Sequence, residues 1–213
     1  MRVEAAARAA LLTPIAKAYS TDVGNEVAYL GVQVHGGMGF IEETGAAQHY
    51  RDARITTIYE GTNGIQAIDL VSRKLAANGG TAVWALLGEL SGIIKQVEAS
   101  NDPAFGTTGA KLREALEALT RTSKWLLERL VDAPNDALAG ATPYLQQFSV
   151  TLGGCMLANE ALAAKSDGNA DAPRYLSLAR FFAENITVQA TSLEHTVTES
   201  AESVAAADAV LLG

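Results

Sequence analysis

A single carboxylate stands where the chain breaks between two helical patterns. Glu60 is followed by Gly61, which has no side chain to shield it, and by Thr62, a residue type favoured as a helix N-cap. Glycine lets a ligand approach the backbone closely. The three residues therefore indicate a carboxylate beside a possible ligand contact, although an ordinary helix junction has the same composition.

A glycine cluster lies upstream of this carboxylate, in the run Gln33-Val-His-Gly36-Gly37-Met-Gly39-Phe40. Its glycines end a helical pattern and permit backbone conformations with positive φ. The amide of Gln33 can donate to phosphate or ring acceptors, and glycine allows close backbone approach. The alternative is a helix end closed by a glycine turn.

Together these motifs resemble the C-terminal helical domain of acyl-CoA dehydrogenases, over residues from about 11 to 75. The run Gln33–Phe40 resembles the turn of that family that contacts the flavin. The run Arg51-Asp-Ala-Arg-Ile, followed by Ile58-Tyr-Glu-Gly-Thr62, resembles the segment that carries its catalytic base. Because both motifs occur in order and at the family's separation, the match is specific.

The resemblance implies α,β-dehydrogenation of an acyl-CoA thioester with FAD as the cofactor. Glu60 matches the base that removes the C2 proton, while C3 gives a hydride to the flavin; a helix-terminal glutamate in solvent is the alternative. Gly61 would let the thioester pass close to the backbone. Thr62 would offer a hydroxyl and an amide to a flavin phosphate or ribose oxygen, or act only as an N-cap. Gly64 departs from the family, which often has a flavin-contacting glutamine there.

The resemblance also assigns the glycine cluster to a cofactor site. Gln33, Gly36 and Gly37 match positions that contact the adenine-side pyrophosphate of a flavin bound to a neighbouring subunit. A homo-oligomer would then be needed for complete sites. An electron-transfer flavoprotein is the implied electron acceptor.

Hydrophobic periodicity predicts helices throughout, so the expected fold class is all-α. In the first half helices are expected over 4–19, 22–35, 42–51 and 62–77. Ser20 and Thr21 are expected to separate the first two, and Pro14 to mark where the first becomes ordered. In the second helix, one apolar stripe is formed by Val23, Val27, Leu30 and Val34. In the fourth helix, the residues expected to face inward are Ile65, Ile68, Val71 and Leu75.

Asn78-Gly79-Gly80 is the clearest boundary and predicts two domains, 1–78 and 81–213. Helices are expected over 81–100, 111–131, 142–165 and 173–186, with a shorter one over 199–212. Long amphipathic helices with short connections favour an up-and-down bundle. This half resembles the C-terminal extension of the subgroup that includes 3-methylmercaptopropionyl-CoA dehydrogenases.

Composition excludes several classes of function. The 213 residues carry a formal net charge of −8 without a basic run, which disfavours nucleic-acid binding and the family's DNA-associated branch. No apolar window is long enough to span a membrane. Cys155 is expected to be a buried small hydrophobe, and a reducing, cytoplasmic location is expected. Trp84 and Trp125 are expected in the core, and the three histidines lack metal-site spacing.

The family's N-terminal and middle domains have no counterpart in the sequence. We therefore expect a truncated, split or partial enzyme that is inactive by itself. The alternative is a non-catalytic helical partner subunit or interaction module derived from the same family.

Overall fold

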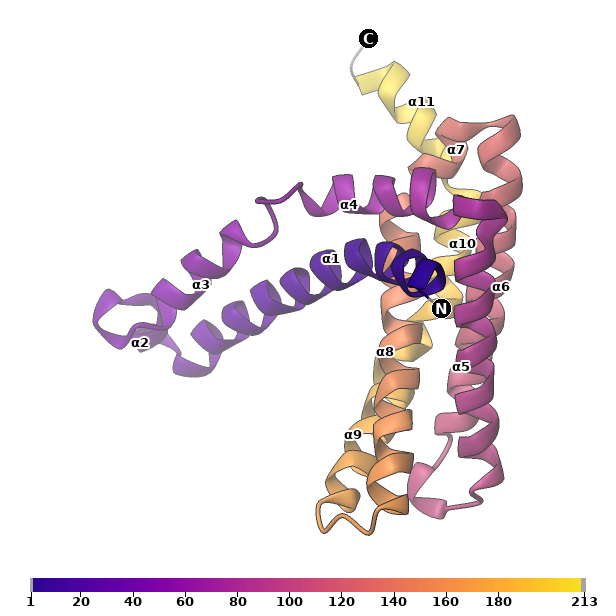
Figure 1. The fold of residues 1–213 in the computed structure, drawn as a ribbon. Helices are drawn as coiled ribbons and strands as arrows, with labels where there is room; N and C mark the ends of the chain where they lie inside the picture. The colour runs from indigo at the N-terminus through magenta and orange to yellow at the C-terminus, as the bar shows by residue number, and fades with distance from the viewer. Residues whose placement is uncertain (1, 212–213) are drawn as a thin grey trace.

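The computed structural model describes residues 2–211, and every regular element within that range is helical. The prediction of an all-α protein is confirmed. Figure 1 shows two parts, a long upright bundle and an arm that projects from its side.

The arm is a helical hairpin whose ends are rooted in the bundle. α1 (Arg2–His35) runs outward and α3 (Ala46–Ile55) returns beside it (Figure 1). The tip holds α2 (Gly37–Phe40) and the 3-10 turn η1 (Glu42–Thr44). The chain then re-enters the bundle through α4 (Asn63–Asp69), the π-helical segment η2 (Leu70–Leu75) and η3 (Ala77–Gly80).

The bundle runs up and down, as predicted. Its long helices are α5 (Thr81–Ala99), α6 (Thr108–Asp132), α8 (Ala141–Ser166), α9 (Ala172–Asn185) and α10 (Ala190–Glu199). Shorter elements are η4 (Pro103–Phe105), α7 (Pro134–Ala139), η5 (Thr187–Gln189) and α11 (Ala201–Leu211). The sequence did not reveal α7 or α10. The expected tail helix is α11, and residue 212 lies outside the described residues.

The predicted break near residues 20 and 21 is wrong, because α1 is one continuous helix of 34 residues. Thr21 Oγ1 donates to the Lys17 and Ala18 carbonyls, so the hydroxyl is satisfied inside the helix. Pro14 does not mark the start either. A mid-helix proline costs about 3 kcal/mol, but burying Leu11 and Ile15 returns about 1.5–3 kcal/mol each.

The bundle core follows the predicted pattern closely. The six positions of α5 predicted to share one face are all buried, namely Val83, Leu86, Leu87, Leu90, Ile94 and Val97. Tyr144 and Phe148 meet edge to face, with ring centroids 5.9 Å apart, and Tyr144 shares a 2.8 Å hydrogen bond with Ser123. Cys155 is buried as expected, and burial raises the pKa of its thiol to about 12.

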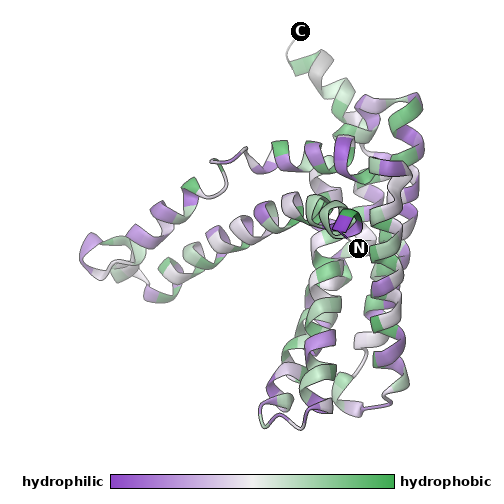
Figure 2. Ribbon diagram, viewed as in Figure 1, coloured by the Kyte–Doolittle hydropathy of each residue, from purple (hydrophilic) through white to green (hydrophobic). Residues whose placement is uncertain are grey.

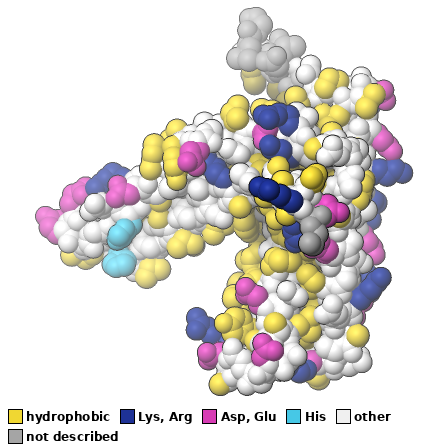
Figure 3. Space-filling model, in the orientation of Figure 1, with side chains coloured by type: hydrophobic (Ala, Val, Ile, Leu, Met, Phe, Trp, Pro, Cys, Tyr) yellow, Lys and Arg dark blue, Asp and Glu magenta, His cyan; other side chains and the backbone are white. Residues whose placement is uncertain are grey.

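Hydrophobic residues recur along the ribbon of the arm (Figure 2), and Figure 3 shows apolar side chains on the surface of the arm. The stripe predicted on the second helix, made of Val23, Val27, Leu30 and Val34, is exposed. Ile65 and Ile68 are also exposed, while Val71 and Leu75 are buried as predicted. Trp84 is 38% exposed, contrary to its expected place in the core, whereas Trp125 packs partly buried against the core.

Among residues 2–211, no helix has the length and apolarity needed to cross a lipid bilayer.

Candidate functional site

Glu60 lies in the turn that joins α3 to α4. Its backbone is left-handed, with φ of 56°, and that of Gly61 is also positive at 85°. Thr62 caps α4, where its Oγ1 accepts a 3.4 Å hydrogen bond from the Ile65 amide, as the sequence predicted. The Glu60 carboxylate is exposed and makes no hydrogen bond or ion pair with any described residue.

Three apolar side chains in the turn of Glu60 and at the start of α4 are uncovered. Ile58, Tyr59 and Ile65 are each about half exposed in the turn and the first part of α4. A lone carboxylate among uncovered apolar groups is chemically suited to act once another surface excludes water.

A polar cluster that the sequence did not reveal ties this turn to α1. Lys17 Nζ donates 2.8 Å hydrogen bonds to the Gly61 carbonyl and to Asn63 Oδ1. The Asn63 amide donates in turn to the Ala18 carbonyl, to Thr21 Oγ1 and to Asp22 Oδ1. In the sequence, the cluster is indicated only by the four-residue spacing of Lys17 and Thr21, which places both on one face if the segment is helical. This spacing does not predict which residues they bind.

The glycine cluster lies at the far end of α1. Gly36 has a φ of 59° and ends the helix, as predicted. A Cβ on Gly36 or Gly37 would have no neighbour within 4 Å, so both backbones are open to a ligand. The exposed Gln33 side chain donates a 3.1 Å hydrogen bond to the Tyr29 hydroxyl. Gly39 differs, because a Cβ there would lie 2.3 Å from the Val32 carbonyl oxygen.

The structure does not bring the two predicted groups together. Gly61 lies beside Lys17, and Gln33 lies 16 residues farther along the same helix. At 1.5 Å per residue, the two groups are about 24 Å apart along α1. One small ligand cannot contact both groups within a single copy of the chain.

An ion pair braces the outer end of the arm. Arg51 binds Glu42 in a bidentate manner at 2.8 and 2.7 Å, and this carboxylate raises the pKa of Arg51. Both side chains are exposed, so the pair contributes little to stability. His35 Nδ1 lies 2.9 Å from the Gly31 carbonyl, which suits a helix-terminal capping role.

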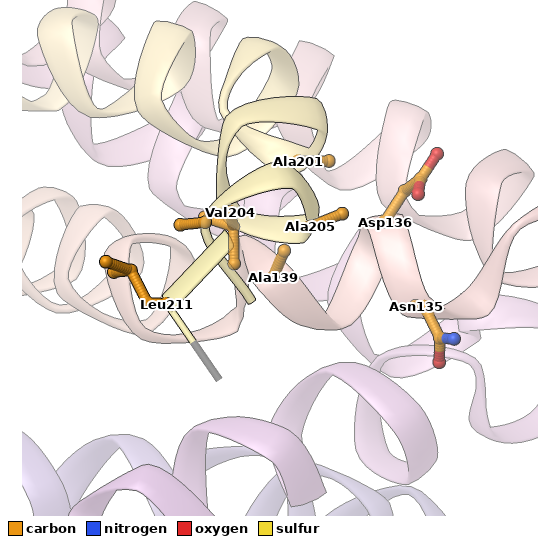
Figure 4. A pocket seen from close by; sticks show the side chains of 8 residues that line it. Asn135, Asp136, Ala139, Ala201, Val204, Ala205 and Leu211 are labelled. Atoms are coloured by element: carbon orange, nitrogen blue, oxygen red, sulfur yellow. The ribbon is translucent and has the colours of Figure 1, made fainter. Parts of the chain in front are cut away.

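Outside the arm, two features of the described residues bear on possible sites, namely metal-binding groups and a surface hollow. The described residues include no group of three or more histidine, cysteine, aspartate or glutamate side chains placed to hold a metal. A hollow between α7 and α11 is lined mainly by alanine, valine and leucine (Figure 4). Its one carboxylate, Asp136, is paired with Arg129 at 2.6 Å.

Comparison with known proteins gives matches to both halves. Residues 1–75 match the family described as "Acyl-CoA dehydrogenase, C-terminal domain". Residues 86–208 match the family described as "Acetyl-CoA dehydrogenase C-terminal like".

Individual relatives agree with these matches. The 3-methylmercaptopropionyl-CoA dehydrogenase of Ruegeria pomeroyi is 38% identical over 215 residues, covering 95% of this chain and 35% of the relative. A butyryl-CoA dehydrogenase of Syntrophomonas wolfei is 30% identical over 190 residues, covering 81% of this chain and 29% of the relative. The caffeyl-CoA reductase-Etf complex subunit CarC of Acetobacterium woodii is 46% identical over 52 residues, covering 24% of this chain and 14% of the relative. The chain therefore spans about a third of the first two relatives, and it belongs to the acyl-CoA dehydrogenase family.

Proposed function

We propose that this chain supplies the catalytic base and part of the flavin site of an acyl-CoA dehydrogenase, within a longer or heteromeric enzyme. The observation that carries the proposal is the unpaired carboxylate of Glu60, held in a left-handed turn beside Gly61. In this proposal residues 1–78 carry the site and residues 81–213 form a helical extension. The chain alone is expected to be inactive, because it leaves the site open.

Glu60 would remove the C2 proton of an acyl-CoA thioester. A proton next to a thioester carbonyl is weakly acidic, so the base must lie directly against it in a water-poor site. Since Glu60 is exposed here, another part of the complete enzyme must cover it together with Ile58, Tyr59 and Ile65.

Gly61 would let the thioester lie close to the turn. Gly61 has no side chain, and its carbonyl accepts a hydrogen bond from Lys17 Nζ. The names of the relatives, which act on butyryl-CoA and 3-methylmercaptopropionyl-CoA, favour an acyl-CoA as the substrate class.

The chain's donor groups fit FAD. Thr62 offers a hydroxyl, Gln33 an exposed amide, and Gly36 and Gly37 open backbone. When bound, the flavin would accept the hydride that leaves C3 of the substrate. The separation of about 24 Å between Gln33 and the Glu60 turn supports contacts to two different flavins, one of them in a neighbouring subunit. We therefore propose a homo-oligomer with shared sites.

An electron-transfer flavoprotein is proposed as the electron acceptor. The support is the relative that is named as a subunit of a caffeyl-CoA reductase-Etf complex.

A non-catalytic partner subunit is the second candidate function. The observation that favours it is the uncovered apolar surface of the arm, where Val34 is 85% exposed and Phe40 81% exposed. In that case the arm would bind a second chain and the carboxylate of Glu60 would be dispensable.

One substitution separates the two functions. The chain would be joined to the remaining two thirds of the Ruegeria relative, and dehydrogenase turnover would be measured with an acyl-CoA and a dye acceptor. Glu60→Gln is expected to lower kcat by about 10²-fold or more, the lower end of typical general-base contributions. Glu43→Gln, the same change at an exposed carboxylate of the arm, is the matched control and is expected to leave kcat unchanged. Full turnover with Glu60→Gln would refute the catalytic proposal and favour the interaction module.

A further inference from the structure

The backbone of Glu60 adopts a conformation that its side chain disfavours. Residues other than glycine are uncommon at positive φ, and a bulky residue there needs support from its surroundings. Among the described residues only Glu60, Asn78 and Asn101 share this property. Asparagine tolerates the left-handed region, whereas glutamate has no such advantage. The surroundings of Glu60 must therefore hold the turn.

Two side chains from two different helices hold its successive carbonyl groups. Gln66 Nε2, from α4, donates a 2.8 Å hydrogen bond to the Glu60 carbonyl. Lys17 Nζ, from α1, donates a 2.8 Å hydrogen bond to the Gly61 carbonyl. A Cβ on Gly61 would lie 3.2 Å from Gln66 Nε2, so glycine leaves room for this approach. We call Lys17 and Gln66 the carbonyl clamp.

The lysine of the clamp is itself held in place. Its Nζ is 2.8 Å from Asn63 Oδ1 and 6.0 Å from the centre of the Tyr59 ring. Asn63 is fixed to α1 through Thr21 and Asp22, and its backbone amide donates to the Thr57 carbonyl at 3.1 Å. All these contacts involve backbone or neighbouring side chains, and none uses the Glu60 carboxylate. These contacts fix the backbone of the turn and leave the Glu60 carboxylate unpaired.

We propose that Lys17 and Gln66 are positioning residues, which hold the Glu60 and Gly61 carbonyls and thereby aim the Glu60 carboxylate. This proposal rests on the proposed role of Glu60 as the base. Without the clamp the Glu60 backbone relaxes toward negative φ, and its side chain leaves the direction set by the turn.

The first test uses the 213-residue chain and does not depend on activity. Lys17→Met and Gln66→Met remove the donors while keeping side-chain length. Backbone NMR chemical shifts of Glu60 are expected to lose their left-handed signature in both variants, while the thermal midpoint of the bundle stays unchanged. Lys95→Met, at an exposed lysine of α5, is the matched control and is expected to leave these shifts unchanged. Unaltered Glu60 shifts in both clamp variants would overturn the proposal.

The second test measures turnover in the joined enzyme described above. Lys17→Met is expected to lower kcat by about 10- to 100-fold, the scale of a small misplacement of a catalytic group, with little change in KM. Lys17→Arg, which keeps a charged donor, is expected to restore part of the loss. If Glu60→Gln abolishes turnover and Lys17→Met has a normal kcat, the positioning proposal alone is wrong. If Glu60→Gln retains full turnover, the function proposed for Glu60 is wrong and the positioning proposal is refuted with it.

Discussion

The second half of α1 and the whole of α5 carry similar apolar stripes with opposite outcomes. In α5, Leu90 is fully buried, and α5 packs against α6 and α8. In the arm, Val27 and Val34 repeat at helical spacing and are 61% and 85% exposed. The difference does not come from the stripes themselves. It comes from whether a second helix of this chain lies over them.

The comparison distinguishes the buried residues that anchor the arm from the exposed apolar surface of the arm. The first half of α1 belongs to the bundle core through Leu11, Ile15 and Ala18. Beyond Ala18 α1 has no buried residue, and α3 beside it has none at all. The arm is therefore fixed at its root, and its apolar faces are free for another surface. The proposed site of Glu60 lies between the buried root of the arm and its exposed part.

The largest expected effect tests this contrast directly. Leu90→Ala should lower the free energy of unfolding by about 2–5 kcal/mol, because it leaves a cavity in a packed core. Val34→Ala in the arm should change it by less than about 0.5 kcal/mol, because the side chain is already in water. Denaturation followed by circular dichroism at several protein concentrations measures both. A cost above about 1 kcal/mol for Val34→Ala would mean that copies of the chain cover the arm.

An intermediate effect sharpens the comparison within the arm. Gly39→Ala places a Cβ 2.3 Å from the Val32 carbonyl and should destabilise the arm tip by about 1–3 kcal/mol. Gly37→Ala meets nothing within 4 Å and is the matched control. Hydrogen exchange should show faster exchange in the last turns of α1 and in α3 for Gly39→Ala alone. Faster exchange across α8 as well would contradict the separation of arm and bundle.

The smallest expected effect concerns the end of the bundle and its pH dependence. Lys165 Nζ lies 2.5 Å from Asp102 Oδ2, and this contact lowers the pKa of Asp102. Because the native pKa lies below the unfolded value, the contribution is present at neutral pH and is lost as pH falls through the native pKa. Asp102→Asn should therefore lower the thermal midpoint slightly at neutral pH and not in acid.

The exposed Asp167 provides the control for this measurement, because Asp167→Asn changes the same charge without breaking a side-chain contact. An equal pH dependence for the two variants would show that the Asp102 contact does not contribute.

Much of the helix inventory was predictable because it depends on local periodicity. The six inward positions of α5, the Thr62 cap and the proline near the start of α9 were predicted and are confirmed. The predicted helix break at Ser20-Thr21 is wrong, because the Thr21 hydroxyl donates to a backbone carbonyl inside the helix. The division at residue 78 stays a prediction, and residues from both sides of it share one hydrophobic core cluster.

The sequence by itself determined that the chain is helical, that a glycine turn follows Gln33, and that Glu60 stands at a helix junction. Only the tertiary structure decided that Val34 and Ile65 face water, that Trp84 is partly exposed, and that Lys17 reaches the Gly61 carbonyl. Periodicity identifies the apolar face of a helix but not what lies over it. A contact across 44 residues depends on how two helices cross, which no local pattern specifies.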